Sequence, residues 1–321
     1  MKSQTTQSHD HIDPNSKEIP LDWFKPLEGA NDSANTVVRP SLSYWKDAWI
    51  RLRSNYIAMG GLIFLILLGI MAIIGPYLTP YSVSETSLAN QNQPPSSTYW
   101  FGTDNLGRDV FTRTWYGARI SLFVGIMAAL IDFTVGVIYG GVSGYKGGRT
   151  DNLMMRIVEI LYGLPYLLVV ILLLVVLGPS LSTIILALTV TGWVGMARIV
   201  RGQVLQIKNY EFVHASKSFG AKTSRIIRKN LLPNTMGPII VQMTLTVPTA
   251  IFAEAFLSFL GLGVQFPFAS WGVMANDALT TILSGHWWRL FFPAFFISAT
   301  MFAFNVLGDG LQDALDPKLR R

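Results

Sequence analysis

A serine flanked by glycines, in Gly141-Val-Ser-Gly144, has the residue types that best fit covalent catalysis in this sequence. A serine nucleophile needs a histidine within hydrogen-bond reach to accept its proton. We place Ser143 at the end of an apolar segment, whereas His214 and His286 fall in two different polar connections. The sequence therefore disfavours an intramembrane serine protease, and we expect no catalytic residue in this chain.

The composition disfavours other site chemistries as well. The 321 residues include no cysteine, which excludes disulfides, thiolate metal sites and cysteine catalysis. We expect His9 and His11 to be solvated tail residues, and we assign no metal site. The phosphate-binding pattern Gly-x-x-x-x-Gly-Lys-Ser/Thr is absent, so nucleotide energy must come from another chain. The net charge of +6 fits a membrane surface and does not require nucleic acid.

Two carboxylates, Asp132 and Glu254, lie inside strongly apolar segments. An ionised group at the middle of a membrane costs about 2.5 to 3.5 kcal/mol on insertion scales, so both side chains need partners or water. Each is a candidate for lining a transport pathway or for a polar contact between helices.

The segments that would position these groups are apolar blocks of membrane-spanning length. Half of the residues are hydrophobic and 14% are charged. A helix needs roughly 20 apolar residues to cross the hydrocarbon core. The sequence predicts an all-α integral membrane protein with a break at Gly163-Leu-Pro165. The six predicted spans are residues 56–78, 120–142, 153–177, 181–197, 238–260 and 290–311.

Basic residues indicate which side of the membrane each connection faces, since lysine and arginine are enriched on the cytoplasmic side. They cluster before the first span, between the second and third, and in residues 198–235, between the fourth and fifth. The connections at 178–180 and 261–288 contain no lysine or arginine. Both termini are therefore predicted to be cytoplasmic.

The chain divides into four parts on this reading. Residues 1–40 are polar and are predicted to be a flexible cytoplasmic tail without a cleaved signal peptide. In residues 41–55, Trp45, Trp49 and Leu52 share one helical face, which predicts an elbow helix on the inner membrane surface. Residues 56–118 would contain the first span and an external loop, and residues 119–321 the other five spans.

The loop at 198–235 has a helical pattern as well as a basic charge. Phe212, Ala215, Ser216 and Phe219 fall at i, i+3, i+4 and i+7, and Gly220 suits the end of a helix. A second helix is expected from about Thr223, as its N-cap, to a break before Pro233. The alternative is a solvated loop that only sets topology.

This order of residues resembles the EAA loop of ABC importer permeases, which runs Glu-Ala-Ala, three residues, Gly, nine residues, Ile, one residue, Leu-Pro. Ala215, Gly220, Leu232 and Pro233 match, whereas His214, Ser216 and Asn230 stand where the family has Glu, Ala and Ile. The resemblance implies a coupling helix that seats in a groove of a cytoplasmic ATPase. Its contact residues would be Phe212, His214, Ala215, Ser216, Phe219 and Gly220, with Pro233 closing the motif.

A second motif, from Phe101 to Leu122, resembles the signature of C-type permease subunits of oligopeptide and dipeptide ABC importers. The glycines permit tight turns, and Arg108 between two aspartates predicts an ion-pair cluster. We expect a rigid external loop and no individual substrate role. The signature residues singled out are Gly102, Asp104, Gly107, Arg108 and Asp109.

The resemblance implies a type I ABC importer permease in a bacterial plasma membrane, importing peptides. Its implied partners are a second permease, two ATP-binding subunits, an extracellular or periplasmic peptide-binding protein and membrane lipid. ATP and magnesium would be bound by the ATPase subunits, with no cofactor in this chain. The alternatives are transport of nickel chelates or another small solute, or a stand-alone secondary transporter.

Overall fold

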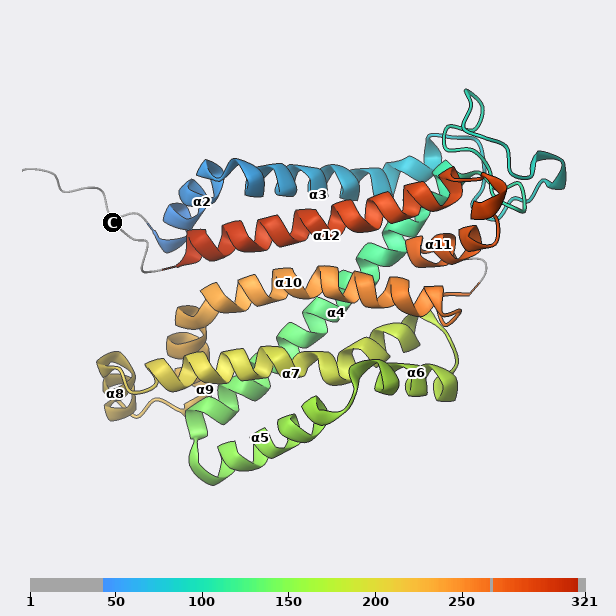
Figure 1. Ribbon diagram of the computed structural model, residues 1–321. Helices are drawn as coiled ribbons and strands as arrows, with labels where there is room; N and C mark the ends of the chain where they lie inside the picture. The colour runs from blue at the N-terminus through green and yellow to red at the C-terminus, as the bar shows by residue number, and fades with distance from the viewer. Residues whose placement is uncertain (1–42, 266–267, 317–321) are drawn as a thin grey trace, which may run out of the picture. The chain divides into compact units, whose positions relative to one another are not determined.

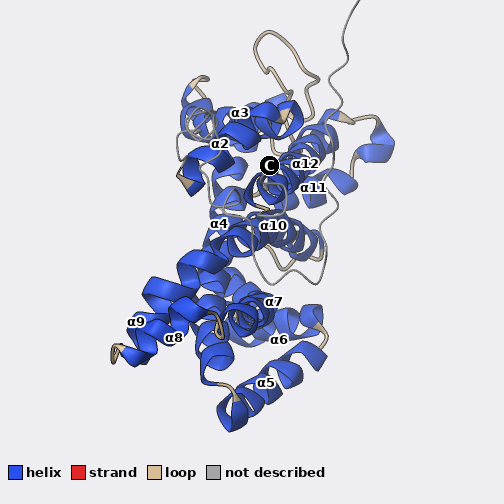
Figure 2. Ribbon diagram, turned by 90° about the vertical axis from the view of Figure 1, so that its left-hand side faces the viewer, coloured by secondary structure: helices blue, strands red, loops and turns tan. Residues whose placement is uncertain are grey.

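The computed structural model describes residues 43–265 and 268–316, and helices form the regular structure of this part of the chain (Figure 2). The tail expected at residues 1–40, with His9 and His11, lies outside the described residues. An isolated bridge joins Thr103 and Asp109. The main helices are α2 (Tyr44–Ser54), α3 (Tyr56–Ile74), α4 (Val110–Lys146), α5 (Gly148–Gly163), α6 (Tyr166–Leu177), α7 (Leu181–Ile207), α8 (Glu211–Ser218), α9 (Thr223–Ile226), α10 (Leu232–Phe259), α11 (Trp271–Leu279) and α12 (Trp288–Leu315).

Five helical stretches in the described residues are long and apolar enough to cross a membrane, and a bent pair of helices makes a sixth candidate. The six predicted spans therefore have counterparts. The helix α4 begins at Val110, ten residues before the expected start of the second span, because Asp109 caps it and its first turns are buried. The helix α7 continues to Ile207, so the span predicted as the shortest is 27 residues long.

The predicted break at Gly163-Leu-Pro165 separates α5 from α6. The two helices meet at an angle of 81°. Proline cannot donate a main-chain hydrogen bond, and the residue before it avoids helical geometry, so the helix ends at Gly163. The third predicted span is thus a bent pair.

A row of small residues lets α4 and α7 approach closely. Gly136, Gly140 and Gly144 recur every four residues along α4, so they share one face. A Cβ atom at Gly136 would lie 2.6 Å from the Cβ of Met196 on α7. Small residues at such spacing are a common way for membrane helices to pack. These three positions, called the glycine seam below, fix the contact between α4 and α7.

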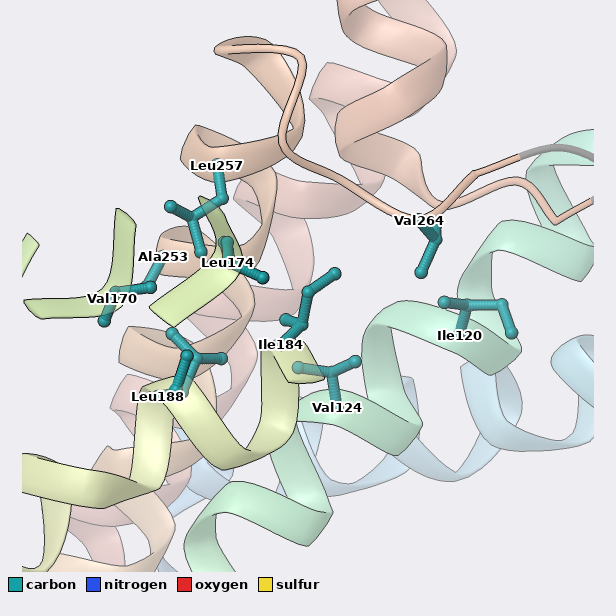
Figure 3. Close-up of a cluster of buried hydrophobic side chains, with 10 residues drawn as sticks. Ile120, Val124, Val170, Leu174, Ile184, Leu188, Ala253, Leu257 and Val264 are labelled. Carbon is teal, nitrogen blue, oxygen red and sulfur yellow. The ribbon is translucent and has the colours of Figure 1, made fainter. Parts of the chain in front are cut away.

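Where α4 and α7 meet α6 and α10, a second buried region is filled by aliphatic side chains (Figure 3). Its members come from all four helices and from the connection after α10. They include Ile120, Val124, Val170, Leu174, Ile184, Leu188, Ala253, Leu257 and Val264.

The predicted elbow helix is present as α2. Leu52 is buried beside Ala58, Leu307 and Ala314, which joins α2 to α3 and α12. Trp45 and Trp49 are about half exposed. The helix is thus held by Leu52 and leaves its tryptophans at the surface, although the three residues were expected to share a face.

The two ends of the helices carry different structures. In Figure 1 the short helices α8 and α9 lie at one end, and the segment of residues 78–109 and α11 lie at the other. The long helices α4, α7, α10 and α12 run between these ends. Any communication between them must pass along the spans.

Candidate functional site

The helix α8 is fastened to the protein by one fully buried side chain. Val213 has an exposed fraction of 0% and belongs to a core cluster with Val204, Ile226 and Leu231. Beyond the helix, Gly220 has a φ of +73°, a left-handed conformation that glycine adopts without steric cost. The predicted helix ending at a glycine is confirmed. Val213 was missed, because it lies outside the i, i+3, i+4 pattern that drew attention to the loop.

The side chains assigned to docking lie mostly on the outside of α8. Phe219 is 90% exposed and Phe212 is 38% exposed. His214 and Ala215 are also exposed, and Ser216 is partly buried. Aromatic side chains on a helix that is anchored through another residue leave apolar surface uncovered by this chain.

Basic side chains are exposed on α8 and in the segment that follows it. The exposed ones are Lys217, Lys222, Arg225, Arg228 and Lys229. Glu211, at the start of α8, is also exposed. A protein surface that fits here would present a hydrophobic pocket with acidic groups near it.

Two residues that depart from the EAA pattern contact each other. The side-chain nitrogen of Asn230 donates to Ser216 Oγ at 3.0 Å. Ser216 Oγ in turn donates to the main-chain oxygen of Phe212 at 3.0 Å. The polar replacements at positions 216 and 230 therefore form one hydrogen-bonded chain that ties α8 to the segment before α10.

The break predicted before Pro233 is wrong. The chain passes from α9 through a π turn, Ile227–Leu231, directly into α10, and Pro233 lies in the first turn of α10. Widening the helix by one residue accommodates the missing proline N–H. Asn234 Nδ2 donates to the main-chain oxygen of Asn230 at 2.6 Å. Thr223 is also not the N-cap, because Lys222 occupies that position.

Near α8, a buried carboxylate joins three helices. Arg201 of α7 donates from Nε and Nη2 to the two oxygens of Asp151 on α5, each at 2.6 Å. Ser143 of α4 donates its hydroxyl to the same carboxylate. Lys208 reaches the main-chain oxygen of Gly144 at 3.0 Å. The Ser143 hydroxyl, considered above as a nucleophile, thus donates to Asp151 and makes a structural contact.

At the other end lies a cluster of five charged side chains, here called the arginine cluster: Asp104, Arg108, Arg113, Asp277 and Arg289. Arg108 Nε donates to Asp104 Oδ2 at 2.6 Å, which confirms one of its two predicted ion pairs. The other expected partner, Asp109, caps α4 instead, and Arg108 Nη2 lies 3.5 Å from Asp277 Oδ2. Arg289 donates to the main-chain oxygen of Asp277 at 2.8 Å. Burial raises the pKa of the Asp277 carboxyl, while Arg113 and Arg108 act in the opposite direction.

The other signature residues shape the loop before α4. Asp109 is the N-cap of α4 and accepts from the main-chain N–H of Thr112 at 2.8 Å. Burial raises the pKa of the Asp109 carboxyl, and the hydrogen bonds from Thr112 oppose that change. Gly102 and Gly107 have φ values of +75° and +71°, which a residue with a Cβ atom rarely adopts. A side chain at Gly107 would also collide with the main-chain oxygen of Ser87.

The two intramembrane carboxylates have different surroundings. Glu254 is 0% exposed and accepts from Ser258 Oγ at 2.8 Å and from Ser121 Oγ at 3.2 Å, which links α10 to α4. Asp132 is 5% exposed, and its Oδ1 atom has no hydrogen-bond partner among the described residues. It faces Gly192 of α7, where a Cβ atom would lie 2.6 Å from Asp132 Oδ2.

Sequence comparison gives relatives over nearly the whole chain. Residues 121–321 match the family model of the binding-protein-dependent transport system inner membrane component, and residues 43–95 match the N-terminal TM domain of oligopeptide transport permease C. The dipeptide transport system permease protein DppC of Bacillus subtilis (strain 168) is 77% identical over 95% of this chain and 95% of its own length. The oligopeptide transport system permease protein OppC of the same strain is 59% identical over 95% of this chain and 100% of its own length.

The fold comparison agrees with the sequence comparison. An inward-facing structure of the MetNI methionine ABC transporter aligns with a TM-score of 0.51 at 21% identity, covering 64% of this chain and 96% of that chain. This likeness concerns the fold alone. The chain therefore belongs to the family of binding-protein-dependent transport system inner membrane components, among the C-type permeases of oligopeptide and dipeptide ABC importers.

Proposed function

We propose that this chain is one of two permease subunits of an ATP-driven importer of dipeptides or oligopeptides. The observation that carries the substrate class is the 77% identity, over 95% of both chains, to a dipeptide transport permease. A glutathione transport permease, GsiD of Escherichia coli O6:K15:H31 (strain 536 / UPEC), is 40% identical over 86% of this chain. Peptide-like solutes are thus the common theme of the relatives' names.

Coupling to an ATPase is assigned to the exposed face of α8. Phe212 and Phe219 supply uncovered aromatic surface, and Val213 fixes the helix to the core of its own chain. A helix fastened in this way would transmit motion to α7 and α10, because its anchor belongs to a buried cluster that includes Val204 of α7 and Ile239 of α10. His214, Ala215, Ser216 and Gly220 complete the contact, and Pro233 lies in the first turn of the helix that would receive the motion.

We place the α8 end of the helices in the cytoplasm. The exposed lysines and arginines around α8 support this orientation, since such residues favour the cytoplasmic side. The segment of residues 78–109 and α11 then face outward, where a peptide-binding protein would deliver its cargo. Both termini would be cytoplasmic, in a multi-pass protein of a bacterial plasma membrane.

The implied assembly contains this chain, a second permease and two ATP-binding subunits, which would hold ATP and magnesium. The two permeases would enclose the path between them, so neither Asp132 nor Glu254 is assigned a substrate contact. Closure of the ATPases would move α8 and tilt the spans from inward-open to outward-open.

Reconstitution tests this proposal against a stand-alone carrier. The complex is purified from native membranes in mild detergent, its subunits are identified by mass spectrometry, and it is placed in liposomes with its binding protein. We expect uptake of labelled dipeptide that requires ATP and the binding protein. Uptake by this chain alone, driven by an ion gradient, would contradict the proposal. Uptake of a nickel chelate with no peptide uptake would keep the ATP-driven mechanism and replace the substrate.

A further inference from the structure

Arg113, in the first turn of α4, is almost completely buried, and its side chain makes no hydrogen bond with any residue that the structure describes. Its exposed fraction is 3%. The nearest carboxylate oxygens, Asp104 Oδ2 and Asp277 Oδ2, lie 3.5 and 3.6 Å from its nitrogens. Those distances allow attraction but exceed the usual length of a charge-assisted hydrogen bond. A guanidinium has five N–H donors, and burying them without acceptors is costly.

The other two arginines of the cluster do not share this lack. Arg108 donates to Asp104 at 2.6 Å. Arg289 donates to the side-chain oxygens of Asn92 and Asn105, both at 3.1 Å, and to the main chain of Asp277. Arg113 is therefore the member of the cluster whose guanidinium is held, among the described residues, only by two longer ion-pair contacts.

The charges of the arginine cluster do not balance. Arg108 and Arg113 form ion pairs with Asp104 and Asp277. Arg289 adds a third buried guanidinium, and it donates to neutral oxygens of Asn92, Asn105 and the main chain of Asp277. Asp109, the nearest further carboxylate in the sequence, accepts from Thr112 and caps α4, and it forms no ion pair with these arginines. One positive charge in a buried setting is thus left over, and a single carboxylate from outside the chain would neutralise it.

A cavity gives such a carboxylate access. It has a volume of about 380 Å³ and is lined by polar side chains together with Val264, Phe268 and Val273. Its polar lining includes Asn105, Arg108, Arg113, Gln265, Asn276 and Asp277. A volume of this size lies within the range of small-molecule sites. The amide groups of Asn105 and Asn276 add hydrogen-bond donors to the lining of the same cavity.

We infer that Arg113 receives the C-terminal carboxylate of the transported peptide as it enters from the outer side. The inference rests on the proposed function, because it assumes a peptide substrate and the outward orientation of this end. Every peptide with a free C-terminus has this carboxylate, whatever its side chains. A site that reads this group alone accepts many sequences and disfavours C-terminally blocked ones.

The test compares a labelled tripeptide with its C-terminal amide in proteoliposomes that contain the whole complex and excess binding protein. The affinity of the binding protein for each peptide is measured first, and both are loaded to equal saturation. We expect Arg113→Gln and Asn276→Asp to lower the ratio of free-acid to amide uptake about tenfold or more, because a charge-assisted contact is lost or repelled. Amide uptake should stay near the wild-type rate, and Arg113→Lys should retain part of the preference.

Uptake of the amide peptide shows whether a variant still folds and assembles, so a loss confined to the free-acid peptide reports on carboxylate recognition. Asn276→Asp keeps the size of the side chain, so it carries the test if Arg113→Gln does not assemble. The exposed Arg156, paired loosely with Glu159 at 3.4 Å, provides the surface control Arg156→Gln, which should leave the ratio unchanged.

Three results would overturn the inference. An unchanged ratio in both variants would mean that the cluster is structural. An equal loss of both peptides, with weaker docking of the binding protein, would assign the missing carboxylate to that partner. Equal uptake of acid and amide by the wild type would show that the transporter does not recognise the C-terminal carboxylate. Failure of the wild type to take up either peptide would instead contradict the proposed function.

Discussion

Asn230 donates its side-chain amide to Ser216 Oγ at 3.0 Å, and this bond joins the π turn before α10 to α8. The two positions are 14 residues apart in sequence and are the places where the EAA pattern has Ile and Ala. The replacements are therefore matched to each other. A polar pair substitutes for an apolar pair at the junction that would transmit motion from α8.

We expect the single variants Ser216→Ala and Asn230→Ile each to weaken coupling, and the double variant to recover much of it. Each single change leaves one polar group without its partner at a cost of about 1 kcal/mol, whereas the double change removes both groups. The measurement is ATPase stimulation by peptide-loaded binding protein in the reconstituted complex. Additive losses in the double variant would show that the hydrogen bond does not matter for coupling.

Phe219, the C-cap of α8, is 90% exposed, compared with 38% for Phe212. Replacing Phe219 with aspartate should reduce uptake at least tenfold. Truncating a buried aromatic anchor at an interface commonly costs about 2 kcal/mol or more in binding free energy. The variant should still insert in the membrane, since Phe219 has few contacts in its own chain. Uptake and co-purification of the ATPase are measured together.

Phe219→Leu serves as the matched control, because it keeps an apolar side chain at the same position. We expect it to retain most of the uptake. Full uptake by the aspartate variant would show that α8 docks through other residues.

The sequence predicted the spans, the helix α8 and the break at Pro165, because each depends on local properties. Apolar length identifies a span, and the combination of Gly163 and Pro165 ends α5. The Asp104–Arg108 ion pair was also predictable, since the two residues are four positions apart. The pairing of Arg201 with Asp151 was not, because 50 residues separate them and only the packing of α5 on α7 brings them together.

Other features could not be predicted from sequence, because each depends on how neighbouring residues are arranged in the folded protein. A proline often marks the end of a helix, but here a π turn precedes Pro233 and the helix continues into α10. Arg113 was expected to be part of a rigid loop without a role of its own. The lack of hydrogen bonds from its guanidinium becomes visible only when the partners of Arg108 and Arg289 are known.

The glycine seam predicts a position that tolerates no side chain. Gly140→Val should destabilise the protein by about 3 kcal/mol or more, because the new Cβ atom collides with the main-chain oxygen of Ala197, which cannot move aside without displacing α7. Gly195→Ala, on α7, is the control, since a Cβ atom there meets open space. Thermal unfolding in detergent compares the two variants. Equal stability of Gly140→Val and the wild type would contradict the close contact of α4 and α7.

Asp109 predicts a dependence of stability on pH. Burial raises its pKa above the ordinary value of 3.8, so the folded protein binds a proton there more tightly than the unfolded chain does. Its contribution to stability is therefore largest at low pH and is lost as the pH rises through the raised pKa. Asp109→Asn keeps the helix cap but does not titrate. We expect the melting temperature of the wild type, relative to that of Asp109→Asn, to fall as the pH is raised from about 4 to about 7. Asp109→Ala should be less stable than Asp109→Asn by about 1 kcal/mol at every pH, because it removes the cap and neither variant titrates. A difference between the wild type and Asp109→Asn that does not change with pH would show that the carboxyl is not the titrating group.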